Sequence, residues 1–123
     1  MANSDNVLRA GLTSKHIDVK ELIANTRFEP IPFGNLLLKP EEHISHKSYP
    51  IPVDDFKFDI LKPNMNTTLI STSPEIVFCL SEKIIISTHT DKKILLKGQS
   101  AVLPASVVEY HISGEGTAAR AYC

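Results

Sequence analysis

The sequence has little of what marks several large classes of protein. Its two cysteines, Cys79 and Cys123, make neither a disulfide framework nor a metal-binding spacing, so we expect reduced thiols and a cytoplasmic location. No apolar run approaches the roughly 18 residues that a membrane-spanning helix needs, and the first residues are too polar for a signal peptide. The 13 basic and 14 acidic residues nearly cancel. This balance argues against a nucleic-acid or anionic-membrane partner.

Short apolar stretches separated by turn residues dominate the second half of the chain. We expect strands at 56–61, 67–71, 75–80, 83–88, 92–96, 101–103, 107–112 and 117–122. Turns are expected at Pro63-Asn64, at 89–91 and at 114–116. Many short strands with almost no helix indicate a β-sandwich or β-barrel. At 123 residues, the chain is long enough for one domain with a real core.

The first half contains one convincing helix, within residues 13–25. Asp18 can cap its N-terminus, Glu21 stands at the position of a capping box, and Leu22 and Ile23 supply an apolar face. The helix is short, because Thr26 and a proline-containing run follow it.

A proline-rich connector follows the helix. Proline has no N–H group to donate in a β-ladder, so the segment should be extended or lie at a sheet edge, with a brief strand at 36–38. The five prolines are Pro30, Pro32, Pro40, Pro50 and Pro52. We therefore expect a loop and helix at 1–27, a connector with an edge strand at 28–55, and the β-domain at 56–123, forming one compact domain overall.

The polar stretch from Ser4 to Thr13 contains the most informative cation. Arg9 lies between two apolar neighbours that can hold its stem while the guanidinium faces a polar space. Its five donors and permanent charge suit a phosphate or a developing oxyanion. The alternative is a local ion pair with Asp5, four residues earlier.

Three segments resemble the C-terminal portion of type I mannose-6-phosphate isomerases. They are Met1–Thr13, Asp18–Leu22 and Tyr49–Phe56. Ser14 stands where the family has proline, which loosens a turn and removes no chemistry. The resemblance implies an all-β, cupin-like jelly roll with one short N-terminal helix. It also implies a zinc enzyme that interconverts mannose 6-phosphate and fructose 6-phosphate.

The resemblance also implies roles for individual residues. Arg9 takes the position of the family's catalytic arginine, which can stabilise the charge of an enediolate while a proton moves between C1 and C2. Apart from the resemblance, Lys15 is a cation close to the motif and a weaker candidate for a contact with the substrate phosphate; the alternative is an ordinary surface lysine. The family's zinc ligands come from the chain that precedes the opening motif. We therefore expect no metal or other cofactor in this chain, and zinc in the full-length family.

The histidines agree with a jelly roll that lacks a metal. None of the five forms the His-x-His pair that places two imidazoles on one face of a strand; they are His16, His43, His46, His89 and His111. His43 and His46, beside Glu41 and Glu42, come closest to a ligand cluster, and we interpret them as a solvated loop. Between residues 75 and 122 the positions where a cupin keeps its ligands are expected to be apolar.

These observations favour the C-terminal domain of a mannose-6-phosphate isomerase that is inactive as an isolated chain. Its partners would be the missing N-terminal catalytic portion and, in the full enzyme, a phosphosugar; a homodimer is left open. The alternative is a free-standing, metal-free cupin-like binding or interaction module. The Asp54-Asp55 pair is interpreted as shaping the entry into the strand that follows it.

Overall fold

The structure, a computed structural model, describes residues 7–62 and 66–123. It divides into two compact units, Met1–Leu37 and Leu38–Cys123. We call residues 7–37 the arm and residues 38–123 the jelly roll. The expected turn at Pro63-Asn64 lies outside the described residues.

The arm contains one α-helix, α1 (Val19–Asn25), and one 3₁₀ turn, η1 (Phe33–Asn35). The helix begins after Asp18, the N-cap predicted from the sequence. The Asp18 carboxylate accepts a hydrogen bond from the Glu21 N–H at 2.9 Å. The prediction of a strand at 36–38 is wrong. The chain turns there, and the Leu36 N–H donates to the Phe33 carbonyl at 3.1 Å.

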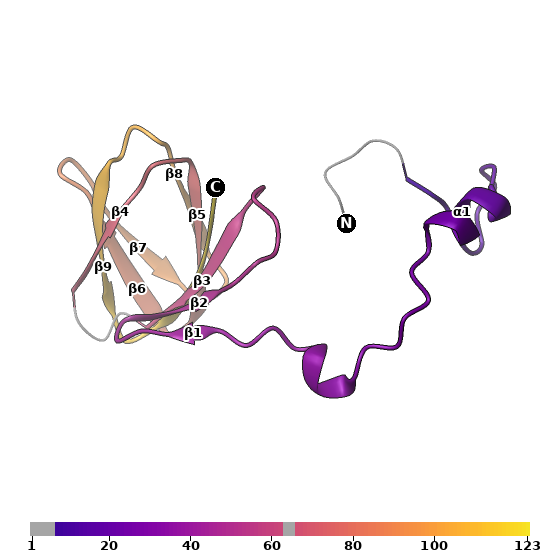
Figure 1. The fold of residues 1–123 in the computed structure, drawn as a ribbon. Helices are drawn as coiled ribbons and strands as arrows, with labels where there is room; N and C mark the ends of the chain where they lie inside the picture. Colours follow the sequence, from indigo (N-terminus) through magenta and orange to yellow (C-terminus); the bar gives the residue numbers. More distant parts are fainter. Residues whose placement is uncertain (1–6, 63–65) are drawn as a thin grey trace. The chain divides into compact units, whose positions relative to one another are not determined.

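The jelly roll consists of two antiparallel sheets (Figure 1). The larger has the strand order β1-β2-β3-β10-β5-β8, and the smaller has the order β4-β9-β6-β7. The strands are β1 (Glu41–Glu42), β2 (His46–Tyr49), β3 (Lys57–Leu61), β4 (Thr67–Ile70), β5 (Glu75–Ser81), β6 (Lys83–Ser87), β7 (Lys92–Leu96), β8 (Ser100–Leu103), β9 (Glu109–Gly114) and β10 (Thr117–Tyr122). The all-β jelly roll is confirmed, with each strand expected after residue 56 within two residues of its place.

The larger sheet begins inside the segment that was expected to be a connector. Strand β2 pairs with β3, with Ser48 opposite Asp59 and Tyr49 opposite Phe58. The sequence of β2, His-Lys-Ser-Tyr, is mostly polar, and its residues are only partly buried. A strand of this kind has no alternation of apolar and polar residues to reveal it.

The core lies between the two sheets and follows from strand alternation. On β5, Val77 and Cys79 face inward and are fully buried, whereas Ile76 and Phe78 face the outside. The smaller sheet contributes residues of the same kind, Ile84 from β6 and Ile112 from β9. Burying such side chains is the main force that holds the sheets together.

A glycine pair allows two turns to approach closely at one end of the jelly roll. Gly114 has φ +126°, and a Cβ at this position would lie 2.6 Å from the Lys83 carbonyl oxygen. A Cβ at Gly116 would lie 2.3 Å from the Ser81 carbonyl oxygen. The turn between β9 and β10 therefore needs glycine at both positions to pack against the turn between β5 and β6.

Candidate functional site

The two cations singled out by sequence lie on the arm, and neither has a side-chain partner among the described residues. Arg9 is partly buried, and Lys15 is exposed in a loop where its backbone N–H donates to the Thr13 hydroxyl at 3.2 Å. Within 7–62 and 66–123 neither side chain makes a hydrogen bond or ion pair. Asp5, the alternative partner of Arg9, lies outside the described residues.

The histidines do not come together as a metal site. The rings of His43 and His46 stack with their centroids 4.4 Å apart beside the turn between β1 and β2. His111 bonds the Thr68 hydroxyl at 2.9 Å across β4 and β9. Over the ranges 7–62 and 66–123, no group of three or more His, Cys, Asp and Glu side chains could hold a metal ion.

The interior of the jelly roll contains a buried ionic cluster, which we call the arginine network. At its centre Arg120 makes two bonds to one carboxylate, from Nε to Glu75 Oε2 at 2.8 Å and from Nη2 to Glu75 Oε1 at 2.5 Å. A third nitrogen, Nη1, donates to Asp59 Oδ2 at 3.4 Å. Forked pairing of this kind is the strongest geometry for a guanidinium and a carboxylate.

Hydrogen bonds extend the arginine network into both sheets. The Tyr110 hydroxyl, from β9 of the smaller sheet, donates to Glu75 Oε2 at 2.7 Å. The Ser48 hydroxyl, from β2 of the larger sheet, donates to Asp59 Oδ1 at 2.7 Å. The Arg120 guanidinium also lies 3.9 Å from the centroid of the Tyr122 ring. The network therefore ties the two sheets together from within.

The electrostatics of the network favour a charged Glu75 and a neutral Tyr110. Burial alone raises the pKa of Glu75, but the hydrogen bonds from Arg120 and Tyr110 outweigh it, so this pKa lies below its ordinary value. Burial and the bond to Glu75 raise the pKa of Tyr110 far above its ordinary value. The Arg120 cation therefore faces a charged Glu75 carboxylate, to which the neutral Tyr110 hydroxyl also donates.

The polar groups of the arginine network are satisfied by one another inside the jelly roll. Among the described residues, no buried side-chain nitrogen or oxygen lacks a hydrogen-bond partner. A buried polar cluster that satisfies itself in this way leaves no unpaired group for a ligand to bind. We conclude that the arginine network is a structural element of the core.

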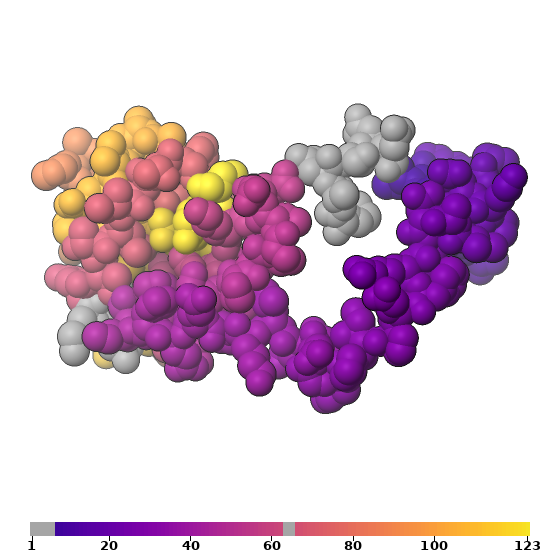
Figure 2. Space-filling model, in the orientation of Figure 1, coloured from indigo at the N-terminus to yellow at the C-terminus, as the bar shows by residue number. Residues whose placement is uncertain are grey.

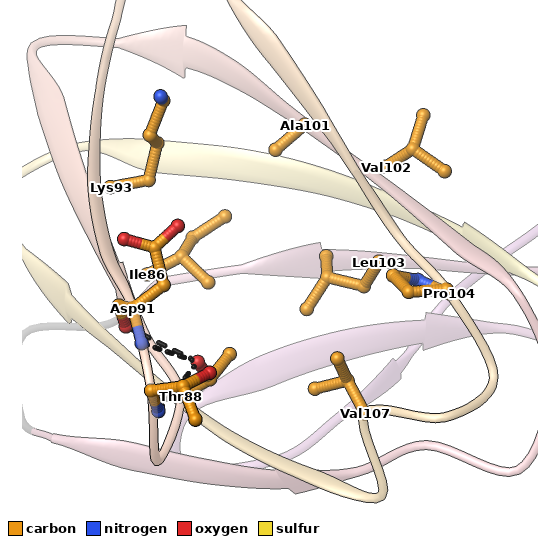
Figure 3. A pocket seen from close by; sticks show the side chains of 10 residues that line it. Ile86, Thr88, Asp91, Lys93, Ala101, Val102, Leu103, Pro104 and Val107 are labelled. Carbon is orange, nitrogen blue, oxygen red and sulfur yellow. Dashed lines mark hydrogen bonds between the residues drawn. The ribbon is translucent and has the colours of Figure 1, made fainter.

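A cleft of about 320 Å³ lies where the edge strands of the two sheets face each other (Figure 3). Ile86, Leu103 and Val107 line it with apolar groups, and Asp91 and Lys93 supply the charges. The nearby Thr88 hydroxyl is already engaged, since it accepts the Asp91 N–H at 3.0 Å. The volume suits a small ligand, but few polar groups converge on the cleft.

Sequence reasoning did not find the arginine network. It considered only the positions between 75 and 122 where a cupin keeps its ligands, which it expected to be apolar. Glu75 and Arg120, which it did not single out, point inward and are almost fully buried. The signal was present in the alternation, because both residues continue the series of inward-facing positions on β5 and β10. A single charged residue in a series of inward-facing, otherwise uncharged positions was the signal that could have revealed the network.

The two sheets and the filled interior define a cupin-like jelly roll. The profile of one family, described as "Mannose-6-phosphate isomerase, cupin domain", matches residues 45–123. The chain belongs to this family.

Named relatives extend the match to the arm. The mannose-6-phosphate isomerase of Salmonella typhimurium is 43% identical over 123 residues, which are 99% of this chain and 32% of that protein. The Escherichia coli enzyme is 41% identical with the same coverage. A crystal structure of the Salmonella enzyme bound to its substrate and a zinc atom superposes with a TM-score of 0.87, at 42% identity, over 99% of this chain and 32% of that one.

The chain therefore spans about a third of the length of the relatives it matches. The described residues include no helix long and apolar enough to cross a membrane.

Proposed function

We propose that this chain is the C-terminal jelly-roll portion of a mannose-6-phosphate isomerase, the zinc-dependent enzyme that interconverts mannose 6-phosphate and fructose 6-phosphate. The observation that carries the proposal is the extent of the match. It covers 99% of the chain at 42% identity to a structure that holds substrate and zinc, and so includes the arm with Arg9.

Arg9 is the residue of this chain that we assign to catalysis. An arginine keeps its positive charge at all physiological pH values and offers several donors in a fixed plane. As a proton moves between C1 and C2 of the sugar, negative charge develops on an oxygen, and a guanidinium held there lowers the barrier. Lys15, six residues further along the exposed loop, is assigned a weaker role in binding the phosphate.

The isolated chain should be inactive. The described residues offer no place for zinc, so the metal and its ligands would be supplied by the portion that the relatives have and this chain does not cover. Removing several cooperating groups from an active site lowers its rate by many powers of ten. One arginine cannot restore such a loss.

An isomerase assay tests this proposal. The purified chain, with and without added zinc, should convert neither sugar phosphate above background. The same chain should give turnover when it is combined with the part of the Salmonella enzyme that lies outside the match. Turnover by the chain alone would show that it carries its own active site and would contradict the proposal.

Arg9→Ala is the sharper test in the combined preparation. We expect kcat to fall by roughly 10²–10³-fold, the usual loss when one donor to a developing oxyanion is removed. Lys15→Ala should raise KM more than it lowers kcat. Lys92→Ala, an exposed lysine on β7, serves as the matched control and should leave both constants unchanged. An unchanged kcat in Arg9→Ala would remove Arg9 from the mechanism.

A further inference from the structure

The cleft between the edge strands β7 and β8 contains a charge of each sign in otherwise mostly apolar surroundings (Figure 3). The residues that line it run from Ile86 to Val107 and all belong to the jelly roll. None of them is a residue that we assign to the isomerase reaction. The proposed function therefore leaves this cleft unexplained.

Strand alternation places Lys93 on the inner side of β7. Leu95, two residues further along the strand, is buried, and Ile86, which pairs with Lys93 across the hairpin, is buried as well. Ile94, between the two inward positions, is 56% exposed on the other side. Lys93 therefore stands at the mouth of the interior, where the two sheets part, and lines the cleft there.

The protein neutralises neither charge of the cleft. The Lys93 ammonium group makes no hydrogen bond or ion pair to any described residue. Asp91 Oδ1 accepts the Lys92 N–H at 2.8 Å, but within the described part of the chain the Asp91 carboxylate forms no ion pair with a cation. The cleft thus presents one ammonium and one carboxylate, and each can bind a ligand group of opposite charge.

Apolar side chains and open space face these charges. Strand β8 contributes Ala101 and Leu103 from its inward positions, and the loop that follows contributes Val107. The small side chain of Ala101 leaves room that a larger residue would fill. The volume of about 320 Å³ is near the lower end of the roughly 300–1,000 Å³ over which proteins bind small ligands. The space therefore suits a ligand with one short aliphatic chain.

The placement of the charges defines the chemistry of the ligand. Figure 3 shows Asp91 and Lys93 on one side of the cleft and Leu103 and Val107 on the other. A matching ligand carries both charges at one end and an aliphatic chain at the other. An aliphatic α-amino acid has this form, because its ammonium and carboxylate groups are attached to the same carbon atom. A fatty acid would instead bring a carboxylate beside Asp91, and an alkylamine would bring an ammonium group beside Lys93, which are repulsive contacts.

We propose that this cleft is a binding site for a free aliphatic α-amino acid, with L-leucine as its representative. Lys93 binds the carboxylate of the ligand and Asp91 its ammonium group, while the aliphatic chain packs against Leu103 and Val107. Both protein charges are exposed, and exposed ion pairs contribute little. We therefore expect a dissociation constant on the order of 1 mM. The proposal goes beyond the isomerase function and does not rest on it.

Titration of the full chain with L-leucine, followed by NMR, tests the proposal. The methyl resonances of Leu103 and Val107 should shift and saturate, while that of Ile23 on α1 should not move. Three related probes each lack one part of the ligand. Leucinamide lacks the carboxylate, 4-methylpentanoate lacks the ammonium group, and glycine lacks the aliphatic chain. Each should bind at least roughly tenfold more weakly than L-leucine, because each loses one of the proposed contacts.

Variants of the cleft make the test specific. Lys93→Met keeps the length of the side chain and removes its charge, so it should weaken the binding of L-leucine by roughly tenfold. It should not weaken the binding of leucinamide, which has no carboxylate to lose. The matched control is Lys92→Met, at an adjacent exposed lysine that does not line the cleft, and it should bind L-leucine as the wild type does. Ala101→Leu should abolish binding because it fills the space.

The outcomes separate the candidate ligands. Saturable shifts at Leu103 and Val107 that weaken in Lys93→Met and persist in Lys92→Met support the proposal. Equal binding of 4-methylpentanoate or leucinamide overturns it, since Asp91 or Lys93 would then have no role. The absence of saturation up to about 50 mM, shifts confined to the arm, or binding of an extended peptide along β8 without a response to leucine would also overturn it. The readout is binding by the chain itself, so a failure of the proposed isomerase function would leave it unchanged.

Discussion

The jelly roll and the arm contain similar apolar side chains but differ in whether they bury them. In the jelly roll Ile84 and Ile112 are fully buried between two sheets, whereas in the arm Ile23 and Ile31 are more than half exposed. The polar groups differ as well. Arg120 is held by two carboxylates in the core, while Arg9 has no partner among the described residues. Arg120, whose donors are bound to carboxylates, serves the stability of the core, and the catalytic role of Arg9 stays a prediction.

The larger sheet also keeps apolar residues on its outer face. Ile76, Phe78 and Val102 are exposed there on neighbouring strands. Figure 2 shows the C-terminal residues, in yellow, at the surface of the same unit. The face differs from the arm because a buried core stabilises its strands from the other side.

The largest expected effect in the jelly roll comes from breaking the arginine network. Arg120→Met leaves Glu75 buried without its cation, so we expect the free energy of unfolding to fall by about 3–5 kcal/mol. Urea denaturation followed by circular dichroism measures it. Lys92→Met, at an exposed position on β7, should change the value by less than about 0.5 kcal/mol. A loss in Arg120→Met as small as that of the control would show that the network is not needed for stability.

Acid should destabilise the jelly roll through the same network. The pKa of Glu75 is lowered in the folded protein from its ordinary value of 4.5, so the folded state favours the charged carboxylate. The resulting stability is fully present above the unfolded-state pKa. It is lost as the pH falls through 4.5 toward the lower pKa of the folded state.

Thermal midpoints measured from about pH 7 down to about pH 3 test this expectation. In Glu75→Gln the part of the acid sensitivity that comes from this carboxylate should disappear, although the variant is less stable at neutral pH. A variant that loses stability on acidification as steeply as the wild type would assign the effect to other carboxylates.

The sequence predicted most of the strands because one face of each is buried. Short runs of apolar residues marked β5 and β6 in the sequence, and in the structure their residues alternate between buried and less buried positions. Strand β2 was not predicted, because its residues are partly buried and mostly polar. The brief strand at 36–38 was wrongly predicted because apolar residues alone cannot distinguish a strand from an exposed segment.

The candidate site was predictable only in part, for a physical reason. Arg9 was found because it belongs to a long motif, and its role stays a prediction. The arginine network was missed because its members come from β3, β5, β9 and β10, far apart in the chain. Only the pairing of the strands brings Asp59, Glu75 and Arg120 together, and no local pattern encodes that pairing.

The smallest expected effect probes the arm. Asp18→Ala removes the acceptor for the Glu21 N–H, a change that costs a helix about 1 kcal/mol. We expect the helical population at 19–25, measured by NMR chemical shifts of the isolated chain, to fall. The thermal midpoint of the jelly roll should not move, because the arm adds nothing to the buried core. Asp18→Asn, which keeps an acceptor oxygen, should preserve the helix. A lower midpoint in Asp18→Ala would mean that the arm supports the jelly roll, and the two regions would then share one stability.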